Sequence, residues 1–166
     1  MYERERSFVG MRLYHSSTVS VKHPDTHHSR LYLDFGRGFY LTSLREQAVK
    51  YALRFKRRGQ PAWLNTYEFT YDETLWKIKR FERYDKEWLD FVAGCREGID
   101  AVNYDMIVGG IANDRVIITI DRYFAGEISL DETLGLLRYE KPNIQYCIRT
   151  DRMLQECIRF IGSEEL

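Results

Sequence analysis

The sequence predicts a single α+β domain in which short strands and amphipathic helices alternate. The chain has 166 residues, 44% of them hydrophobic, and a chain of this length usually forms one domain that buries roughly two-thirds of its unfolded surface. No internal repeat, linker or low-complexity tract divides the sequence, and its three prolines fall where connections between elements are expected. We therefore expect one domain over residues 1–166.

The first half of the chain contains the clearest periodic segments. A strand is predicted over Gly10–Tyr14, and residues 63–71 alternate aromatic and polar side chains, which is typical of a half-buried strand. Between them, Leu44–Arg58 places apolar residues at three- and four-residue spacing and predicts a helix. Ser43 followed by Glu46 predicts a capping box at the start of that helix.

The second half predicts three or four more helices around two short strands. One helix is expected over Asp85–Ala93, and Asn113–Ala125 favours a helix although its β-branched residues also fit a strand. Ser129 and Glu132 form another capping-box pattern ahead of a short helix. The remaining expected elements are an apolar run at Tyr104–Val108, a strand at Gln145–Arg149 and a closing helix with Met153, Leu154, Cys157, Ile158 and Ile161 on its inner side.

Charge and composition exclude several classes of protein. Lys plus Arg and Asp plus Glu number 25 each, so the whole molecule offers no general attraction to nucleic acid or to an anionic membrane. No apolar run is long enough to cross a membrane, and the charged segment MYERERSFVG does not resemble a signal peptide. These features predict a cytoplasmic protein with no membrane partner.

The cysteines and histidines do not form a recognisable metal pattern. Cys95, Cys147 and Cys157 are scattered and lack CxxC spacing, which predicts reduced, buried thiols rather than disulfides or a zinc site. The clustered histidines lack matching ligands at metal-binding spacing, so a polar loop is the expected interpretation of His23, His27 and His28.

Two short basic clusters leave room for local nucleic-acid binding. They are RFKRR at Arg54–Arg58 and KIKR at Lys77–Arg80. Clusters of this kind are most often solvated ends of helices or strands, and the alternative is a contact with a phosphate backbone. The sequence alone leaves both interpretations open.

Three polar and glycine-rich segments are poorly explained by packing. They are LYHSS at Leu13–Ser17, FGRGFY at Phe35–Tyr40, and NIQY at Asn143–Tyr146. Each is weak alone, because a lone histidine or a GxG pattern is usually structural. Their order along the chain and their internal spacing are informative: Tyr51 follows Tyr40 by eleven positions, which directs two rings toward one gap.

In this order and spacing the three segments resemble the ADP-ribosyltransferase superfamily, particularly its diphtheria-toxin and poly-ADP-ribose polymerase branch with a His-Tyr-Glu triad. The resemblance implies a split β-sandwich with flanking helices and NAD as co-substrate. Two tyrosines that face the nicotinamide ring would add stacking of about 1 kcal/mol each. By this resemblance the catalytic residues are His15, Tyr40 and Gln145, and the cofactor-binding residues are His15, Ser16, Ser17, Phe35, Gly36, Gly38, Tyr40, Tyr51 and Gln145.

Two positions depart from the pattern of that family. Ser16 stands where glycine is usual, and Gln145 stands where a glutamate opens the last motif. Cleavage of the nicotinamide glycosidic bond builds positive charge on the ribose, which a carboxylate stabilises and an amide does not. The candidates to supply that charge are Asp34 and Asp114, and each also fits an ordinary loop or cap residue.

The expected function is therefore mono-ADP-ribosyl transfer from NAD to a macromolecular acceptor, either nucleic acid or protein. Asn143, two positions before Gln145, disfavours arginine as the acceptor. At a finer level the motifs resemble a group of small uncharacterised bacterial proteins often encoded beside a small partner, which implies a toxin or phage-defence role with an antitoxin-like partner. The alternatives are a catalytically silent NAD or ADP-ribose sensor, and an NAD-dependent RNA 2′-phosphotransferase, whose basic phosphate site is not evident.

Overall fold

The computed structural model describes residues 8–29, 33–99 and 103–166. Its helices are α1 (Arg45–Arg57), α2 (Lys86–Arg96), α3 (Asp114–Phe124), α4 (Leu130–Leu137) and α5 (Asp151–Cys157), with a 3-10 turn η1 (Glu73–Leu75). Its strands are β1 (Phe8–Ser17), β2 (Phe39–Leu41), β3 (Trp63–Asp72), β4 (Ile78–Arg80), β5 (Met106–Ile111), β6 (Asn143–Ile148) and β7 (Ile158–Glu165).

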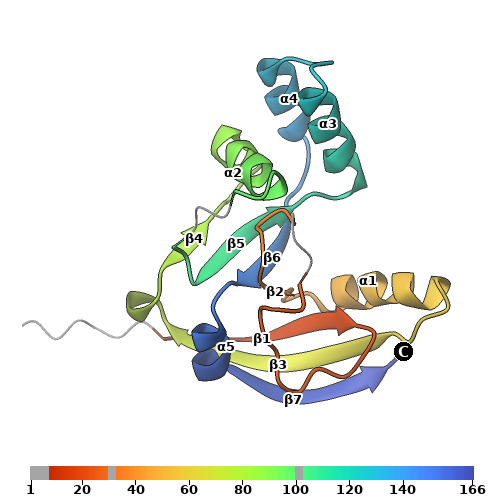
Figure 1. Cartoon of the computed structure of the whole chain (residues 1–166), viewed down its shortest axis with the longest axis vertical. Coiled ribbons are helices and arrows are strands. Elements are labelled where there is room, and N and C mark those ends of the chain that lie inside the picture. The colour runs from red at the N-terminus through yellow and green to blue at the C-terminus, as the bar shows by residue number, and fades with distance from the viewer. Residues whose placement is uncertain (1–7, 30–32, 100–102) are drawn as a thin grey trace, which may run out of the picture.

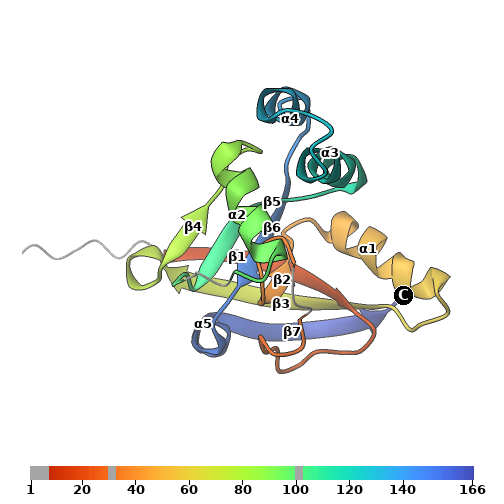
Figure 2. The ribbon, with the colours of Figure 1, turned by 45° about the horizontal axis from the view of Figure 1, so that its top comes forward.

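The strands form two sheets that are bridged at one position. The first sheet has the order β1-β3-β7 and is antiparallel throughout. The second has the order β2-β6-β5-β4, in which only the β4–β5 pair is parallel. A bridge between Tyr14 and Thr42 joins the end of β2 to β1. Figures 1 and 2 show the two sheets, with α1 beside β1 and helices α2, α3 and α4 beyond the second sheet.

Two apolar clusters hold this arrangement together. One fills the space between the sheets, with Leu13, Tyr67 and Phe69 from the first sheet against residues of the second such as Phe39 and Ile148. The other covers the opposite face of the second sheet, where α2, α3 and α4 contribute Trp88, Val116 and Leu137, among others. The second sheet is therefore the middle layer, and burial on both faces explains the continuous apolar character of β5.

The structure confirms a single mixed α+β domain and most of the predicted elements. The segment with competing interpretations is a helix, α3, because Asn113 caps its first turn and Val116 and Ile120 fall on one buried side. The predicted capping at Ser129 is also present, since its hydroxyl accepts a hydrogen bond from the Glu132 amide. Cys95, Cys147 and Cys157 are buried, as expected.

Two local predictions are wrong. The closing helix ends at Cys157, and the residues from Ile158 to Ile161 belong to β7, because β3 offers an open edge whose backbone groups pair with this segment. The capping box of Ser43 and Glu46 does not form. Instead, the amide of Leu44 donates to the hydroxyl of Thr42, one residue earlier than predicted.

Candidate functional site

One cavity of about 1190 Å³ lies where β1, β2, β6 and α1 come together, and the loop after β1 and the start of α3 complete its wall. This volume exceeds the roughly 300–1,000 Å³ of common small-molecule sites and is sufficient for a dinucleotide. The three motifs identified from sequence converge here. The predicted residues that line the cavity are His15, Ser16, Ser17, Asp34, Gly38, Tyr40, Tyr51 and Gln145.

His15 is fixed in one orientation near the end of β1. Its Nδ1 atom lies 2.7 Å from the backbone oxygen of Tyr40, and its ring stacks on Phe39 at 4.1 Å between centroids. Burial lowers the pKa of His15, so the imidazole is neutral at neutral pH. Since Nδ1 must carry the proton to donate to the Tyr40 carbonyl, Nε2 is left as a hydrogen-bond acceptor.

This lowered pKa predicts a pH dependence of folding stability. The unfolded chain binds a proton at His15 with an ordinary pKa of about 6.5, whereas the folded chain resists protonation. The contribution is therefore fully present above pH ~6.5 and is lost as the pH falls toward the folded pKa, by at most about 1.4 kcal/mol per pH unit. Urea unfolding at a series of pH values should show this loss in the wild type and a smaller loss in His15→Asn, which cannot titrate. If the stability of the two proteins depended on pH in the same way, the lowered pKa of His15 in the folded chain would be contradicted.

Ser16 makes a structural contact that a glycine would not make. The residue lies in extended conformation opposite Leu64 of β3, so a side chain is tolerated there. Its hydroxyl donates to the backbone oxygen of Ala48 in α1. The Ser17 hydroxyl accepts from the amide of Val19 at 3.3 Å and helps to turn the chain out of the strand. Ser16 thus attaches α1 to the cavity wall.

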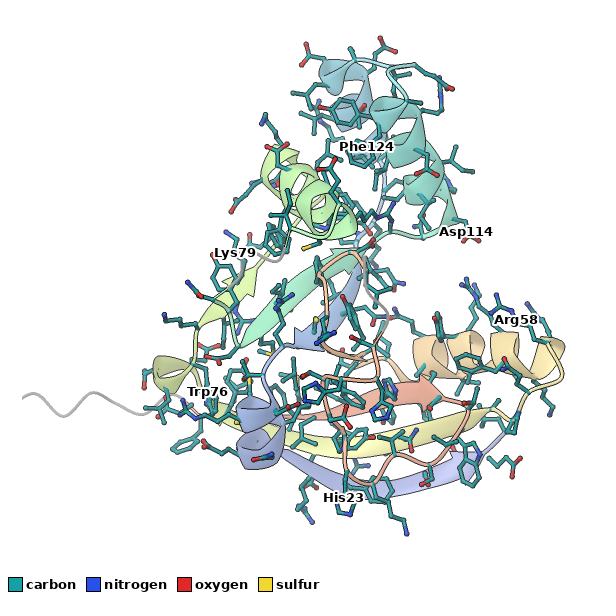
Figure 3. All side chains as sticks on the ribbon, viewed as in Figure 1. His23, Arg58, Trp76, Lys79, Asp114 and Phe124 are labelled. Atoms are coloured by element: carbon teal, nitrogen blue, oxygen red, sulfur yellow. The ribbon has the colours of Figure 1, made fainter. Side chains whose placement is uncertain are left out.

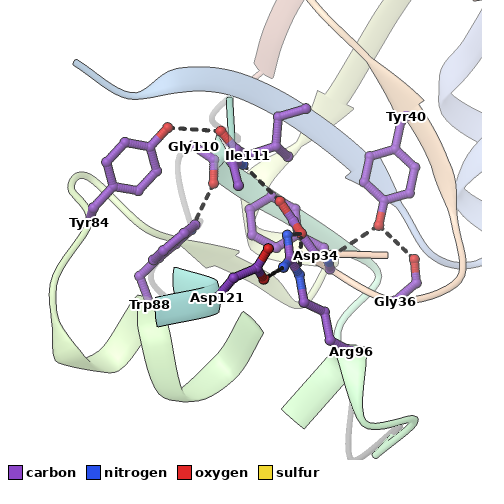
Figure 4. Close-up of polar contacts among 11 residues, drawn as sticks. Asp34, Gly36, Tyr40, Tyr84, Trp88, Arg96, Gly110, Ile111 and Asp121 are labelled. Atoms are coloured by element: carbon purple, nitrogen blue, oxygen red, sulfur yellow. Dashed lines mark hydrogen bonds and ion pairs between the residues drawn. The ribbon is translucent and has the colours of Figure 1, made fainter. Parts of the chain in front are cut away.

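Tyr40 contributes a ring to the cavity, and its hydroxyl is already engaged. The hydroxyl donates to the backbone oxygen of Gly36 at 2.6 Å and accepts from the amide of Phe35 at 3.2 Å; Figure 4 shows both contacts. Burial strongly raises the pKa of Tyr40 above its usual range. The residue is therefore a neutral wall residue whose hydroxyl fixes the preceding loop, and it is not a base.

Phe35 and Gly36 do not line the cavity, contrary to the expectation that they contact a ligand. Phe35 is fully buried in the core on the far side of the second sheet. Gly36 has a φ of +75°, and its carbonyl receives the Tyr40 hydroxyl. Gly38 does line the cavity, in close contact with β6: a Cβ atom there would lie 2.5 Å from the Cys147 sulfur and 2.8 Å from the Ile148 carbonyl oxygen.

One side of α1 forms a wall of the cavity through Gln47, Ala48, Tyr51 and Phe55. Tyr51 is 48% exposed, so its ring is available to a ligand. Gln47 was missed from sequence, although it precedes Tyr51 by one helical turn. Its Oε1 accepts from the Thr42 hydroxyl at 3.0 Å, and its buried Nε2 has no partner within the described residues. A ligand that reached this amide would satisfy a buried donor.

Gln145 lines the cavity from β6, where it pairs with Gly109 of β5. It is half-buried, and its side-chain amide makes no hydrogen bond to the described parts of the chain. The glutamine therefore stands in the wall with its amide available for a ligand, at the position where the family resemblance expects a carboxylate.

Neither of the two carboxylates predicted to supply that charge presents an uncompensated charge in the cavity wall. Asp34 lines the cavity, but its Oδ1 accepts from Arg96 at 2.8 and 2.9 Å and its Oδ2 from the Ala112 amide at 2.8 Å (Figure 4). Arg96 therefore compensates the charge of Asp34. Asp114 is exposed at the start of α3 and does not line the cavity (Figure 3). Sequence reasoning had no signal for the ion pair between Asp34 and Arg96, which are distant in the chain.

The loop after β1 forms another wall that the sequence did not predict. Asn65, a fully buried residue of β3, accepts a hydrogen bond from the Val21 amide at 2.8 Å, and the Tyr67 hydroxyl donates to the Val21 oxygen at 2.7 Å. Asp25 lines the cavity and pairs with His28, whose side-chain hydrogen bond lowers the pKa of Asp25. Over residues 8–29, 33–99 and 103–166, no cluster of His, Cys, Asp and Glu could hold a metal ion.

The fold and cavity define an α+β protein with an open cavity whose volume is sufficient for a dinucleotide. The chain matches, over residues 11–160, the family described as "Protein of unknown function (DUF3990)", and it belongs to that family. No curated protein and no solved structure matches it significantly. No helix in the described part of the chain has the length and apolar character needed to span a bilayer.

Proposed function

We propose that this protein binds NAD in the cavity and transfers ADP-ribose to a macromolecular acceptor. One observation carries the proposal: residues of three separate motifs line one cavity, namely His15, Tyr40 with Tyr51, and Gln145. The two-sheet arrangement joined at the bridge between Tyr14 and Thr42 supports the split β-sandwich that the motifs imply.

In this proposal the walls recognise different parts of NAD. The neutral His15 accepts a hydrogen bond at Nε2 from a hydroxyl of the adenosine ribose, which an imidazolium would not do. The exposed Tyr51 ring and the Tyr40 ring supply flat surfaces for nicotinamide. Gln145 holds a hydroxyl of the nicotinamide ribose through its amide oxygen.

The reaction is a substitution at the anomeric carbon of that ribose. The bond from C1′ to the nicotinamide nitrogen breaks, and nicotinamide leaves as a neutral molecule with the electron pair of that bond. A nucleophilic nitrogen or oxygen of the acceptor forms the new bond to C1′ and loses its proton to solvent. The ribose carries partial positive charge in the transition state, and the dipole of the Gln145 amide stabilises it less than a carboxylate would.

A second candidate function is NAD binding without catalysis, and the charge of the residues in the same cavity wall favours it. Gln145 carries no charge, and the cavity carboxylate Asp34 is compensated by Arg96. This candidate predicts NAD binding with no release of nicotinamide, whereas the transferase predicts both.

The binding step is tested with variants of the cavity wall. His15→Ala and Tyr51→Ala should each weaken NAD binding by about 1 to 3 kcal/mol, through a lost hydrogen bond and lost stacking respectively. Calorimetric titration measures both. Tyr139→Ala is a suitable control, because Tyr139 is 87% exposed and does not line the cavity. If both cavity variants bound NAD as tightly as the wild type and the control, NAD would not occupy this site.

A further inference from the structure

The structure distinguishes the two basic clusters that the sequence left equivalent. In KIKR, Lys79 pairs with Glu87, and Arg80 pairs with Glu73 and the Tyr71 hydroxyl. In RFKRR, the cations at positions 54, 56, 57 and 58 are exposed, and none forms an ion pair with another described residue. Among the described residues, Lys77 is the one cation of KIKR without an ion pair, whereas all four cations of RFKRR lack one.

This cluster lies on the helix that also lines the cavity. Residues 45–58 contain six basic residues and one acidic residue, Glu46, in a chain whose net charge is zero. The Arg54 guanidinium lies 5.4 Å from the centre of the Tyr51 ring, and both Tyr51 and Phe55 line the cavity. In Figure 3, Arg58 lies at the outer end of α1, away from both sheets. Basic and aromatic side chains of α1 thus form a continuous surface between its exposed end and the cavity.

We propose that this basic–aromatic surface, formed by Arg54, Phe55, Lys56, Arg57 and Arg58 beside Tyr51, binds single-stranded nucleic acid and presents it as the acceptor for ADP-ribose. A row of cations beside exposed rings is the usual design of sites for single strands, because the cations bind phosphates and unpaired bases stack on the rings. A duplex would offer the same phosphates and no free base face.

The inference rests on the proposed transferase function and names its acceptor. A nitrogen or oxygen of the bound strand forms the bond to C1′ of the ribose as nicotinamide departs with the electron pair, and the proton of that atom passes to solvent. An acidic protein surface is the competing partner for these cations. The planar Arg54 guanidinium, stacked over the Tyr51 ring, leaves its outer face for a flat base, which an acidic side chain cannot use in the same way.

The test measures binding of short fluorescent single-stranded DNA and RNA by anisotropy, with duplex DNA and polyglutamate as competing ligands. The wild type should bind single-stranded DNA and single-stranded RNA more tightly than duplex DNA or polyglutamate. The variant Lys56→Gln/Arg57→Gln/Arg58→Gln should lose at least about tenfold in affinity for it, and its dependence of log K on log salt should flatten by about 2. The control Lys86→Gln/Arg122→Gln/Arg138→Gln removes as much charge from exposed positions on or beside α2, α3 and α4 and should bind normally.

Calorimetry with NAD on the same proteins separates this inference from the proposed function. The α1 variant should bind NAD like the wild type, since Lys56, Arg57 and Arg58 do not line the cavity. If the protein bound NAD but showed no preference for single strands, or preferred polyglutamate, the nucleic-acid inference would be overturned. The proposed function would still stand. Strand binding without NAD binding would overturn the proposed function.

Discussion

Gln145→Glu should raise the rate of nicotinamide release from NAD by about 100-fold. A carboxylate at this position would face the positive charge that develops on the ribose, and single groups that stabilise transition-state charge typically change rates by about 10² to 10³. The gain should appear in kcat with little change in NAD affinity, because the charge acts chiefly in the transition state. Continuous measurement of nicotinamide release at saturating NAD determines it.

Gln145→Ala provides the opposite change at the same position. It removes the amide without adding charge, so it should weaken NAD binding and lower any basal release. A Gln145→Glu protein that binds NAD normally and releases nicotinamide no faster than the wild type would show that residue 145 does not face the reacting ribose.

Gly38→Ala should lower the free energy of unfolding by about 1 to 3 kcal/mol. The added Cβ atom would meet the Cys147 sulfur at 2.5 Å and the Ile148 carbonyl oxygen at 2.8 Å, and backbone cannot yield as a flexible side chain can. Since β2 is only three residues long, displacement from β6 disturbs all of its pairing. Urea denaturation measures the change.

Gly135→Ala is the matched control for that substitution. Gly135 lies inside α4 with nothing within 4 Å of a Cβ atom, so alanine should stabilise the protein by roughly 0.5 to 1 kcal/mol. Equal effects of the two substitutions would contradict the close approach of β2 and β6.

Local patterns predicted the elements whose signals lie within a few residues. The apolar spacing along α1 and the alternation along β3 each reflect burial against one neighbouring layer, and the structure has both elements. The prediction of a helix over the whole closing segment was wrong because its deciding signal is not local. Ile158 and Ile161 fit a helical face as well as a strand, and the deciding interaction is the open edge of β3, which is remote in sequence.

The candidate site shows the same difference between local patterns, which the sequence reveals, and contacts between distant residues, which it does not. Ordered motifs indicated His15, Tyr40 and Gln145, which line one cavity. The engagement of Asp34 by Arg96 depends on how α2 packs near the loop before β2, which no local pattern encodes. Phe35 and Gly36 were expected to contact a ligand because they belong to the FGRGFY motif, and they instead support Tyr40 from behind the cavity wall.

The most direct test of NAD-dependent transfer is incubation of the purified protein with a cell lysate and NAD labelled in its adenosine part. Free nicotinamide and label retained on macromolecules are followed together, with Gln145→Ala as the control. We expect nicotinamide release and retained label in the wild type, both reduced in the control. If a wild-type protein shown to be folded released no nicotinamide and no label were retained on macromolecules, the proposed transferase activity would be contradicted.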